Sequence, residues 1–89
     1  MQTMFKPVTV YSQPGCAPCA RIKKLLDQAG IEYDDIDVTK DQAARDYVVN
    51  DLKASGTPVV VDERGPIIGT KPDEWKALIE YHTASETGL

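Results

Sequence analysis

The 89-residue sequence predicts a small α/β domain with the element order β-α-β-α-β-β-α. Short runs rich in β-branched residues alternate with longer segments whose apolar residues recur at helical spacing. The chain's two cysteines, Cys16 and Cys19, lie where the first such run gives way to the first helical segment. An initial βαβ unit and a hairpin near the C-terminus together predict a four-stranded mixed sheet flanked by three helices.

Composition indicates one folded domain over residues 1–89, with fraying expected only at residues 85–89. Hydrophobic residues make up 42% of the chain and charged residues 27%, which is ordinary for a globular protein. The formal net charge of −4 argues against a nucleic-acid or membrane-surface binder. No apolar run has the length of a signal peptide or a transmembrane helix, and two cysteines are too few for a secreted disulfide framework. We therefore expect the protein in the reducing cytoplasm, and we also expect a monomer.

The first strand is expected at residues 8–11, and Pro14-Gly15 separates it from the first helix. Cys16 is expected at the N-cap or first position of this helix, with Ala17, Pro18 and Cys19 in its first turn. A proline is tolerated there because first-turn amides have no intrahelical partner. Gly30 is expected to end the helix, whose apolar face would consist of Ile22, Leu25, Leu26 and Ala29.

The middle of the chain predicts a strand at residues 31–38 and then a second helix. Thr39-x-x-Gln42 has the form of a capping box, so the helix is expected to begin there. Gly56 falls where the chain has left the helix. The predicted buried side of this helix consists of Ala44, Tyr47, Val48 and Leu52.

The last third of the chain predicts a hairpin and a third helix. Strands are expected at residues 57–61 and 66–69, with the turn at residues 63–65 between them. Pro72 is expected near the first position of the last helix, followed by two acids in the first turn, where the helix dipole favours them. His82 is expected to be a satisfied or semi-exposed residue late in this helix rather than a catalytic base, because it shares the helical spacing of Trp75, Leu78 and Ile79.

The chemistry of the chain is expected at the two cysteines. A C-x-x-C pair at a strand-to-helix junction is typical of redox sites, because the helix N-terminus favours a thiolate over a thiol. A zinc site needs about four ligands, and only His82 is available besides the thiols. A structural disulfide across so short a loop would contribute only about 2 kcal/mol. Inert buried thiols are the third alternative. We favour thiol–disulfide exchange, with Cys16 as the exposed nucleophile and Cys19 as the resolving thiol.

Three blocks of sequence resemble the thioredoxin superfamily, and specifically its glutaredoxin-sized branch. They are Val10-Tyr11-Ser12-x-Pro14-x-Cys16-x-x-Cys19, Thr57-Pro58-Val59-Val60-Val61 and Gly69-x-Lys71-Pro72-Asp73. Within that branch the chain is most similar to the NrdH-redoxin group, which is glutaredoxin-like in fold and thioredoxin-like in activity. The resemblance implies that Pro58 is a cis-proline facing the thiols. The Thr57 backbone would then pair with an incoming extended substrate strand.

The same resemblance implies the remaining substrate-binding positions, Gln13, Ala17, Pro18, Lys71 and Asp73. Glutaredoxins that use glutathione typically carry a lysine where this chain has Gln13. They have Pro-Tyr between the cysteines, and a Gly-Gly-Asp motif where this chain has Gly69-Thr70 followed by Lys71-Pro72. These departures favour an NrdH-redoxin-like protein.

The resemblance also implies partners. The expected reductant is thioredoxin reductase, which draws on NADPH, and the expected client is ribonucleotide reductase or another protein with a disulfide. The chain is expected to bind no cofactor or metal of its own. The alternative is a glutathione-dependent dithiol glutaredoxin. A third possibility is a glutaredoxin-like module that holds an iron–sulfur cluster between two protomers.

Overall fold

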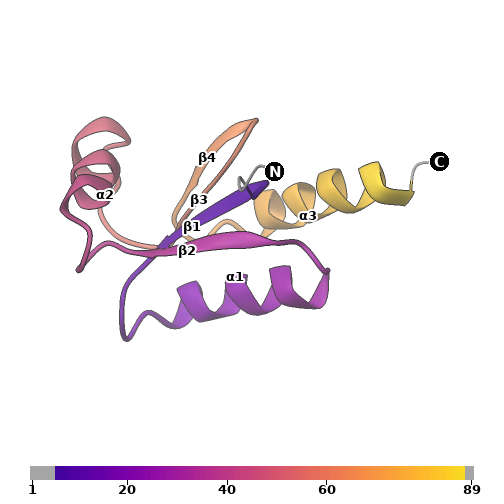
Figure 1. Cartoon of the computed structure of the whole chain (residues 1–89), viewed down its shortest axis with the longest axis horizontal. Coiled ribbons are helices and arrows are strands. Elements are labelled where there is room, and N and C mark those ends of the chain that lie inside the picture. The colour runs from indigo at the N-terminus through magenta and orange to yellow at the C-terminus, as the bar shows by residue number, and fades with distance from the viewer. Residues whose placement is uncertain (1–5, 88–89) are drawn as a thin grey trace, which may run out of the picture.

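The computed structural model describes residues 6–87 (Figure 1). Its elements are β1 (Val8–Ser12), α1 (Ala17–Gln28), β2 (Tyr33–Asp37), α2 (Gln42–Asp46), the π-helical turn η1 (Tyr47–Asp51), β3 (Val59–Asp62), β4 (Gly65–Ile68) and α3 (Pro72–Thr87). The predicted α/β class and element order are confirmed, and η1 is an addition to them.

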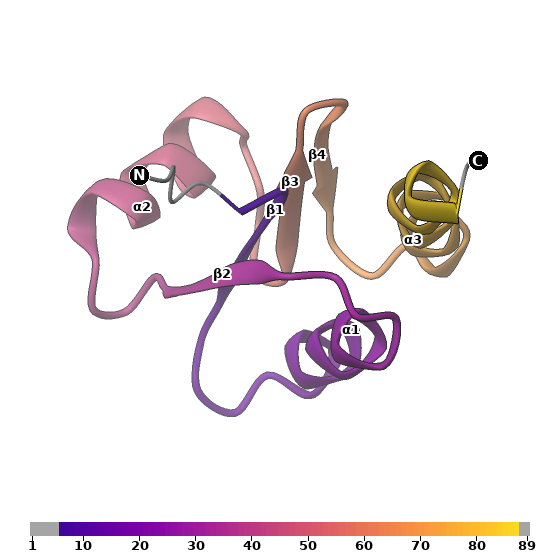
Figure 2. The same ribbon diagram turned by 45° about the vertical axis from the view of Figure 1, so that its right-hand side comes forward.

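The four strands form one mixed sheet in the order β2-β1-β3-β4. β1 pairs with β2 in parallel, whereas β3 runs antiparallel to both β1 and β4. Figure 2 shows α1 and α3 on one face of the sheet and α2 on the other. The sheet therefore separates a layer of two long helices from a layer formed by α2 and η1.

Each face of the sheet has its own hydrophobic core. Side chains alternate between the faces along a strand, so neighbours on β1 and β3 contribute to different cores. The core under α1 and α3 contains Val8, Val10, Ile22, Leu26, Ile31, Val60, Ile67, Trp75 and Leu78. The core under α2 contains Val38, Ala44, Val48, Ala54 and Val59. Burial of each large apolar side chain contributes roughly 1.5–3 kcal/mol, so both helical layers are held firmly against the sheet.

Helix α1 begins and ends where the sequence analysis predicts. Cys16 is the N-cap residue, in extended backbone conformation. At the other end, Gly30 has a φ of 73°, a left-handed conformation that favours glycine. The Gly30 N–H donates to the carbonyl of Asp27, and the Ile31 N–H donates to that of Leu26. This pair of bonds is a Schellman motif, which satisfies carbonyls that the helix end leaves free.

The start of α2 differs from the sequence prediction. The capping box at Thr39 is wrong, because Asp41 is the N-cap and its carboxylate accepts a hydrogen bond from Ala44 N–H at 3.0 Å. Thr39 instead donates through both its N–H and its hydroxyl to the carboxylate of Asp37. A short polar turn therefore precedes the helix and delays its first residue to Gln42.

The second helix also ends differently from the single α-helix that the sequence predicts. After Asp46 the chain widens into η1, where the Leu52 N–H donates to the Tyr47 carbonyl at 3.0 Å. The next residue, Lys53, has a φ of 60°, which is uncommon outside glycine. Of the predicted buried side, Ala44 and Val48 are buried, whereas Tyr47 and Leu52 are half-buried and pack against the same core. The π-helical turn leaves Val49 48% exposed on the surface.

The hairpin and last helix follow the predictions with shifted bounds. β3 begins at Val59 rather than at residue 57, because Pro58 has no N–H to donate to the ladder. β4 begins at Gly65 rather than at residue 66. α3 begins at Pro72 as predicted and continues to Thr87, which includes part of the segment expected to fray. Gly88 and Leu89 lie outside the described residues.

His82 has the structural role that its position on α3 predicts. Its Nε2 lies 3.0 Å from the carboxylate of Asp62, whose side chain is only 1% exposed. The same carboxylate accepts hydrogen bonds from the backbone N–H and the guanidinium of Arg64. These contacts join the end of β3 to α3 and satisfy a buried charge.

Candidate active site

The two cysteines form a disulfide at the N-terminus of α1, with an S–S distance of 2.07 Å and a Cα–Cα distance of 5.2 Å. Cys16 is half-buried, whereas Cys19 is 1% exposed. An incoming disulfide can therefore meet Cys16 first, with Cys19 behind it. Cys16 is thus the more accessible of the two, although it is half-buried rather than exposed, and the roles of nucleophile and resolving thiol stay predictions.

The first turn of α1 provides an electropositive environment for Cys16. The sulfur of Cys16 accepts a hydrogen bond from the Cys19 N–H at 3.2 Å, which is the N-cap contact of the helix. Free first-turn amides and the helix dipole stabilise negative charge at such a position. Ala17 and Pro18 complete the turn, with Ala17 exposed and Pro18 half-buried. We therefore expect this arrangement to favour a thiolate at Cys16 once the disulfide is reduced.

Thr57 and Pro58 lie on the opposite side of the disulfide. The Thr57–Pro58 peptide bond is cis, as the family resemblance implies, and Pro58 is buried. The Thr57 hydroxyl donates to the sulfur of Cys16 at 3.5 Å. Sequence reasoning assigned only the Thr57 backbone to substrate binding, so this side-chain contact is new. The only sign of this contact in the sequence is that the residue before Pro58 is a threonine, whose side chain carries a hydroxyl donor.

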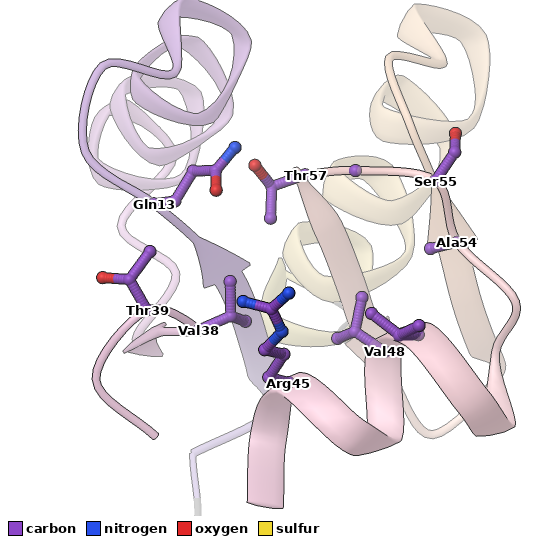
Figure 3. A pocket seen from close by; sticks show the side chains of 10 residues that line it. Gln13, Val38, Thr39, Arg45, Val48, Ala54, Ser55 and Thr57 are labelled. Carbon is purple, nitrogen blue, oxygen red and sulfur yellow. The ribbon is translucent and has the colours of Figure 1, made fainter. Parts of the chain in front are cut away.

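A pocket of about 180 Å³ opens beside Thr57. Figure 3 shows Gln13 and Thr57 at one end, with the Arg45 side chain reaching into the pocket from α2. The described residues that line the pocket are Gln13, Val38, Thr39, Arg45, Val48, Val49, Ala54, Ser55, Gly56 and Thr57. Sequence reasoning placed Gln13 and Thr57 at the site but missed Arg45. The available signal was that Arg45 is the one cation in residues 42–51.

Two predicted substrate-binding residues lie apart from this pocket. Lys71 precedes α3 and Asp73 is in its first turn; both side chains are exposed, and neither lines the pocket. No hydrogen bond joins either side chain to Cys16 or Cys19 within residues 6–87. Their assignment to substrate binding stays a prediction.

A polar network ties α1 to the sheet one helical turn after Cys19. Lys23 donates to the carboxylate of Asp35 at 2.8 Å, and the buried Ser12 donates to the same carboxylate at 2.7 Å. Burial alone would raise the pKa of Asp35, but the hydrogen bonds from Lys23 and Ser12 outweigh it and lower that pKa below its ordinary value. The network fixes the helix that carries both cysteines.

Among residues 6–83, whose side chains the structure describes, no three or more His, Cys, Asp or Glu side chains are arranged to hold a metal ion. No helix among them combines the length and apolar character needed to cross a bilayer.

The geometry accounts for a two-electron exchange between thiols and disulfides. With Cys16 as the predicted nucleophile of the reduced protein, its thiolate attacks one sulfur of a client disulfide, breaks that S–S bond and releases the other sulfur as a thiolate. The Cys19 thiolate then attacks the Cys16 sulfur, which releases the second client thiolate. The client gains two electrons and the protein ends with the Cys16–Cys19 bond observed here.

The chain is similar to several known proteins in sequence and in fold. The Gene 56 protein of Mycobacterium phage D29 is 57% identical over 90 residues, covering 100% of both chains. The crystal structure of a mutant of the thioredoxin-like protein BC3987 has a TM-score of 0.77 and 33% identity, covering 85% of this chain and 97% of that one. The NrdH-redoxin from Escherichia coli has a TM-score of 0.72 and 22% identity, covering 80% and 92%.

The family model described as Glutaredoxin matches residues 8–64, which is well over half of the chain. That span contains the cysteine pair, the cis-proline and all ten described residues that line the pocket. The chain is a thiol–disulfide oxidoreductase of the thioredoxin fold, and it belongs to the glutaredoxin family.

Proposed function

We propose that this protein is a dithiol electron carrier of the NrdH-redoxin type, reduced by thioredoxin reductase rather than by glutathione. The observation that carries this proposal is the pocket beside Cys16, in which the position of the family's glutathione-binding lysine is occupied by the uncharged Gln13. The protein takes two electrons from the reductase, which draws them from NADPH. It needs no cofactor of its own, because the cysteine pair holds both electrons.

Glutathione is a tripeptide with two carboxylates, so a site for it needs several donors around it. Arg45 is the only cation among the described residues of the pocket. Pro18 and Pro72 have no N–H to offer. Loss of two charge-assisted hydrogen bonds, each worth about 1.5–3 kcal/mol, weakens binding by about two orders of magnitude or more. The pocket is also smaller than the roughly 300–1,000 Å³ usual for small-molecule sites.

The proposed client is a protein disulfide, and by resemblance that of ribonucleotide reductase, which needs a dithiol donor at each turnover. One structural neighbour is described as a glutaredoxin-like NrdH-redoxin with a thioredoxin-like activity profile. We propose the same combination, a glutaredoxin-like fold with a thioredoxin-like activity, for this chain. Exchange of this kind needs a reducing compartment, for which we propose the cytoplasm.

Two coupled assays, both followed as NADPH oxidation, test the choice of reductant. In the first, the protein receives electrons from thioredoxin reductase, taken in parallel from a mycobacterium and from E. coli, and reduces insulin. In the second, it receives electrons from glutathione and glutathione reductase and reduces hydroxyethyl disulfide. We expect the first system to be at least about tenfold more efficient, in line with the weakened glutathione site.

The Cys16→Ser variant is the blank for both assays, because it lacks the nucleophile. If the glutathione system proves the faster of the two, the proposal is wrong and the protein is a glutathione-dependent dithiol glutaredoxin.

A further inference from the structure

The pocket beside Cys16 carries a single unneutralised charge. Arg45 is the only charged residue among the described residues that line it. Its side chain is exposed, and it makes no ion pair with any carboxylate in residues 6–83, whose side chains the structure describes. In Figure 3 the guanidinium lies inside the pocket beside Val38, below the end that Gln13 and Thr57 form. A guanidinium in this setting is available to a ligand carboxylate, which it can bind through two parallel hydrogen bonds.

The rest of the pocket is mainly aliphatic. Val38, Val48 and Ala54 are buried residues that form part of its wall. Val49 also lines it and is 48% exposed, because the π-helical turn η1 presents this side chain outward. Partial exclusion of water by these groups strengthens an ion pair formed beside them. The site thus suits a side chain with a short aliphatic stem and a carboxylate, namely aspartate or glutamate.

Thr57 connects this pocket to the reacting sulfur. It lines the pocket and its hydroxyl lies 3.5 Å from the sulfur of Cys16. A client cysteine bonded to Cys16 therefore places neighbouring client residues over the pocket. In an extended segment, side chains two positions apart project to the same side. A residue close to the client cysteine in sequence can then reach Arg45, and a volume of about 180 Å³ suits a side chain rather than a whole tripeptide.

We propose that this pocket selects protein disulfides with an aspartate or glutamate near the reactive cysteine, and that Arg45 binds that carboxylate. This inference rests on the proposed function and specifies its substrate class. A protein of net charge −4 repels acidic clients at long range. Because Arg45 attracts a carboxylate only when it lies close to the reacting disulfide, it favours some client disulfides over others.

Single-turnover kinetics with synthetic peptides test the proposal without any reductase. Each extended peptide carries its cysteine as a mixed disulfide with 2-mercaptoethanol. A glutamate is moved through the positions that flank the cysteine, and glutamine and lysine versions serve for comparison. The reduced protein is mixed with each peptide, and the rate of disulfide loss is followed by quenched chromatography. We expect the glutamate peptide at its best position to react about threefold to tenfold faster than the glutamine peptide.

Variants assign this preference to Arg45. Arg45→Gln should abolish it, and Arg45→Glu should reverse it in favour of the lysine peptide. Lys40→Gln is the matched control, since it removes an exposed cation just before α2 that does not line the pocket. That variant should keep the preference, and added salt should weaken the preference in the wild type.

Equal rates for glutamate and glutamine peptides at every position would overturn the inference and leave the oxidoreductase activity standing. A preference that survives in Arg45→Gln would overturn it as well. If Arg45→Gln slows only the glutathione-coupled assay, Arg45 serves a glutathione carboxylate, and the client-specificity proposal is wrong. Failure of the wild type to reduce any peptide would overturn both this inference and the proposed function.

Discussion

The hydroxyl of Thr57 donates a hydrogen bond to the sulfur of Cys16 at 3.5 Å, across 41 positions of sequence. This contact places a side-chain donor on the nucleophile in addition to the amides of α1. Hydrogen bonds to a charged form favour that form, so in the reduced protein Thr57 stabilises the Cys16 thiolate. The residue before the cis-proline thus contacts the sulfur through its side chain, while the pairing of its backbone with a substrate strand stays a prediction.

Replacement of Thr57 by valine, which has nearly the same shape, should raise the pKa of the Cys16 thiol. We expect iodoacetamide to label this variant about threefold more slowly at neutral pH, because one hydrogen bond to the thiolate is lost. The pH profile of labelling should shift upward in Thr57→Val and stay in place in Thr57→Ser, which keeps the hydroxyl. Identical profiles for all three proteins would mean that the hydroxyl does not act on the thiolate.

The two cysteines should behave differently when each is replaced by serine. Cys19→Ser should accumulate a mixed disulfide between Cys16 and the client, because the resolving thiol is missing. Cys16→Ser should lose all exchange, because the remaining thiol is buried. Non-reducing electrophoresis and intact-protein mass spectrometry would detect the trapped species. Trapping by Cys16→Ser instead would reverse the assignment of the nucleophile.

The lowered pKa of Asp35 predicts a pH dependence of stability. Folding lowers this pKa, so the folded chain binds the proton more weakly than the unfolded chain does. The stabilisation is therefore present above the unfolded pKa of about 3.9, and it is lost as the pH falls through the lower folded value. It should amount to less than about 1 kcal/mol, because the Asp35 side chain is 42% exposed and solvent screens the Lys23 pair.

Urea unfolding of the wild type and Asp35→Asn, at pH values from about 6 down to about 2, would measure this effect. The difference in unfolding free energy should be largest at the upper end of the range and should shrink in acid. Glu32→Gln is the control, because Glu32 is an exposed carboxylate outside the Ser12–Asp35–Lys23 network. A difference that stays constant with pH would contradict the role assigned to ionised Asp35.

His82 should affect stability but not catalysis. His82→Ala removes a partner of the buried Asp62 carboxylate, which should cost about 1–3 kcal/mol of unfolding free energy. The rate of disulfide exchange and its pH profile should stay unchanged below the unfolding transition, since His82 contacts the end of β3 rather than the cysteines. A change in the pH profile of exchange would make His82 part of the catalytic machinery.

Local sequence signals predicted both ends of α1, the helix at whose N-terminus the two cysteines lie. The position of Cys16 at the helix start follows from the strand, Pro14-Gly15 and the periodic apolar face after it. Gly30 marks the end of α1, because a left-handed residue is needed there. Such signals lie within a few residues of the structure that they determine, so the sequence alone reveals them.

The parts that could not be predicted depend on choices between competing local interactions or on packing. Thr39 has the sequence of an N-cap, but the carboxylate of Asp37 captures both its N–H and its hydroxyl, and Asp41 caps the helix instead. The π-helical turn that exposes Val49 has no motif of its own. Arg45 reaches the active site because α2 packs beside the end of β2, a relationship across the tertiary fold.

The separation of the two helical layers by the sheet has a consequence for engineering. Cys16 caps α1 and Cys19 lies in its first turn, on one face of the sheet, whereas Arg45 lies in α2, on the other face (Figure 2), and Val49 lies in η1, which follows α2. The two sets converge only near Thr57 and the segment that follows β1. Transplanting residues 41–56 from a relative should therefore retarget the redoxin to a different client while the acidity and redox chemistry of its thiols are retained.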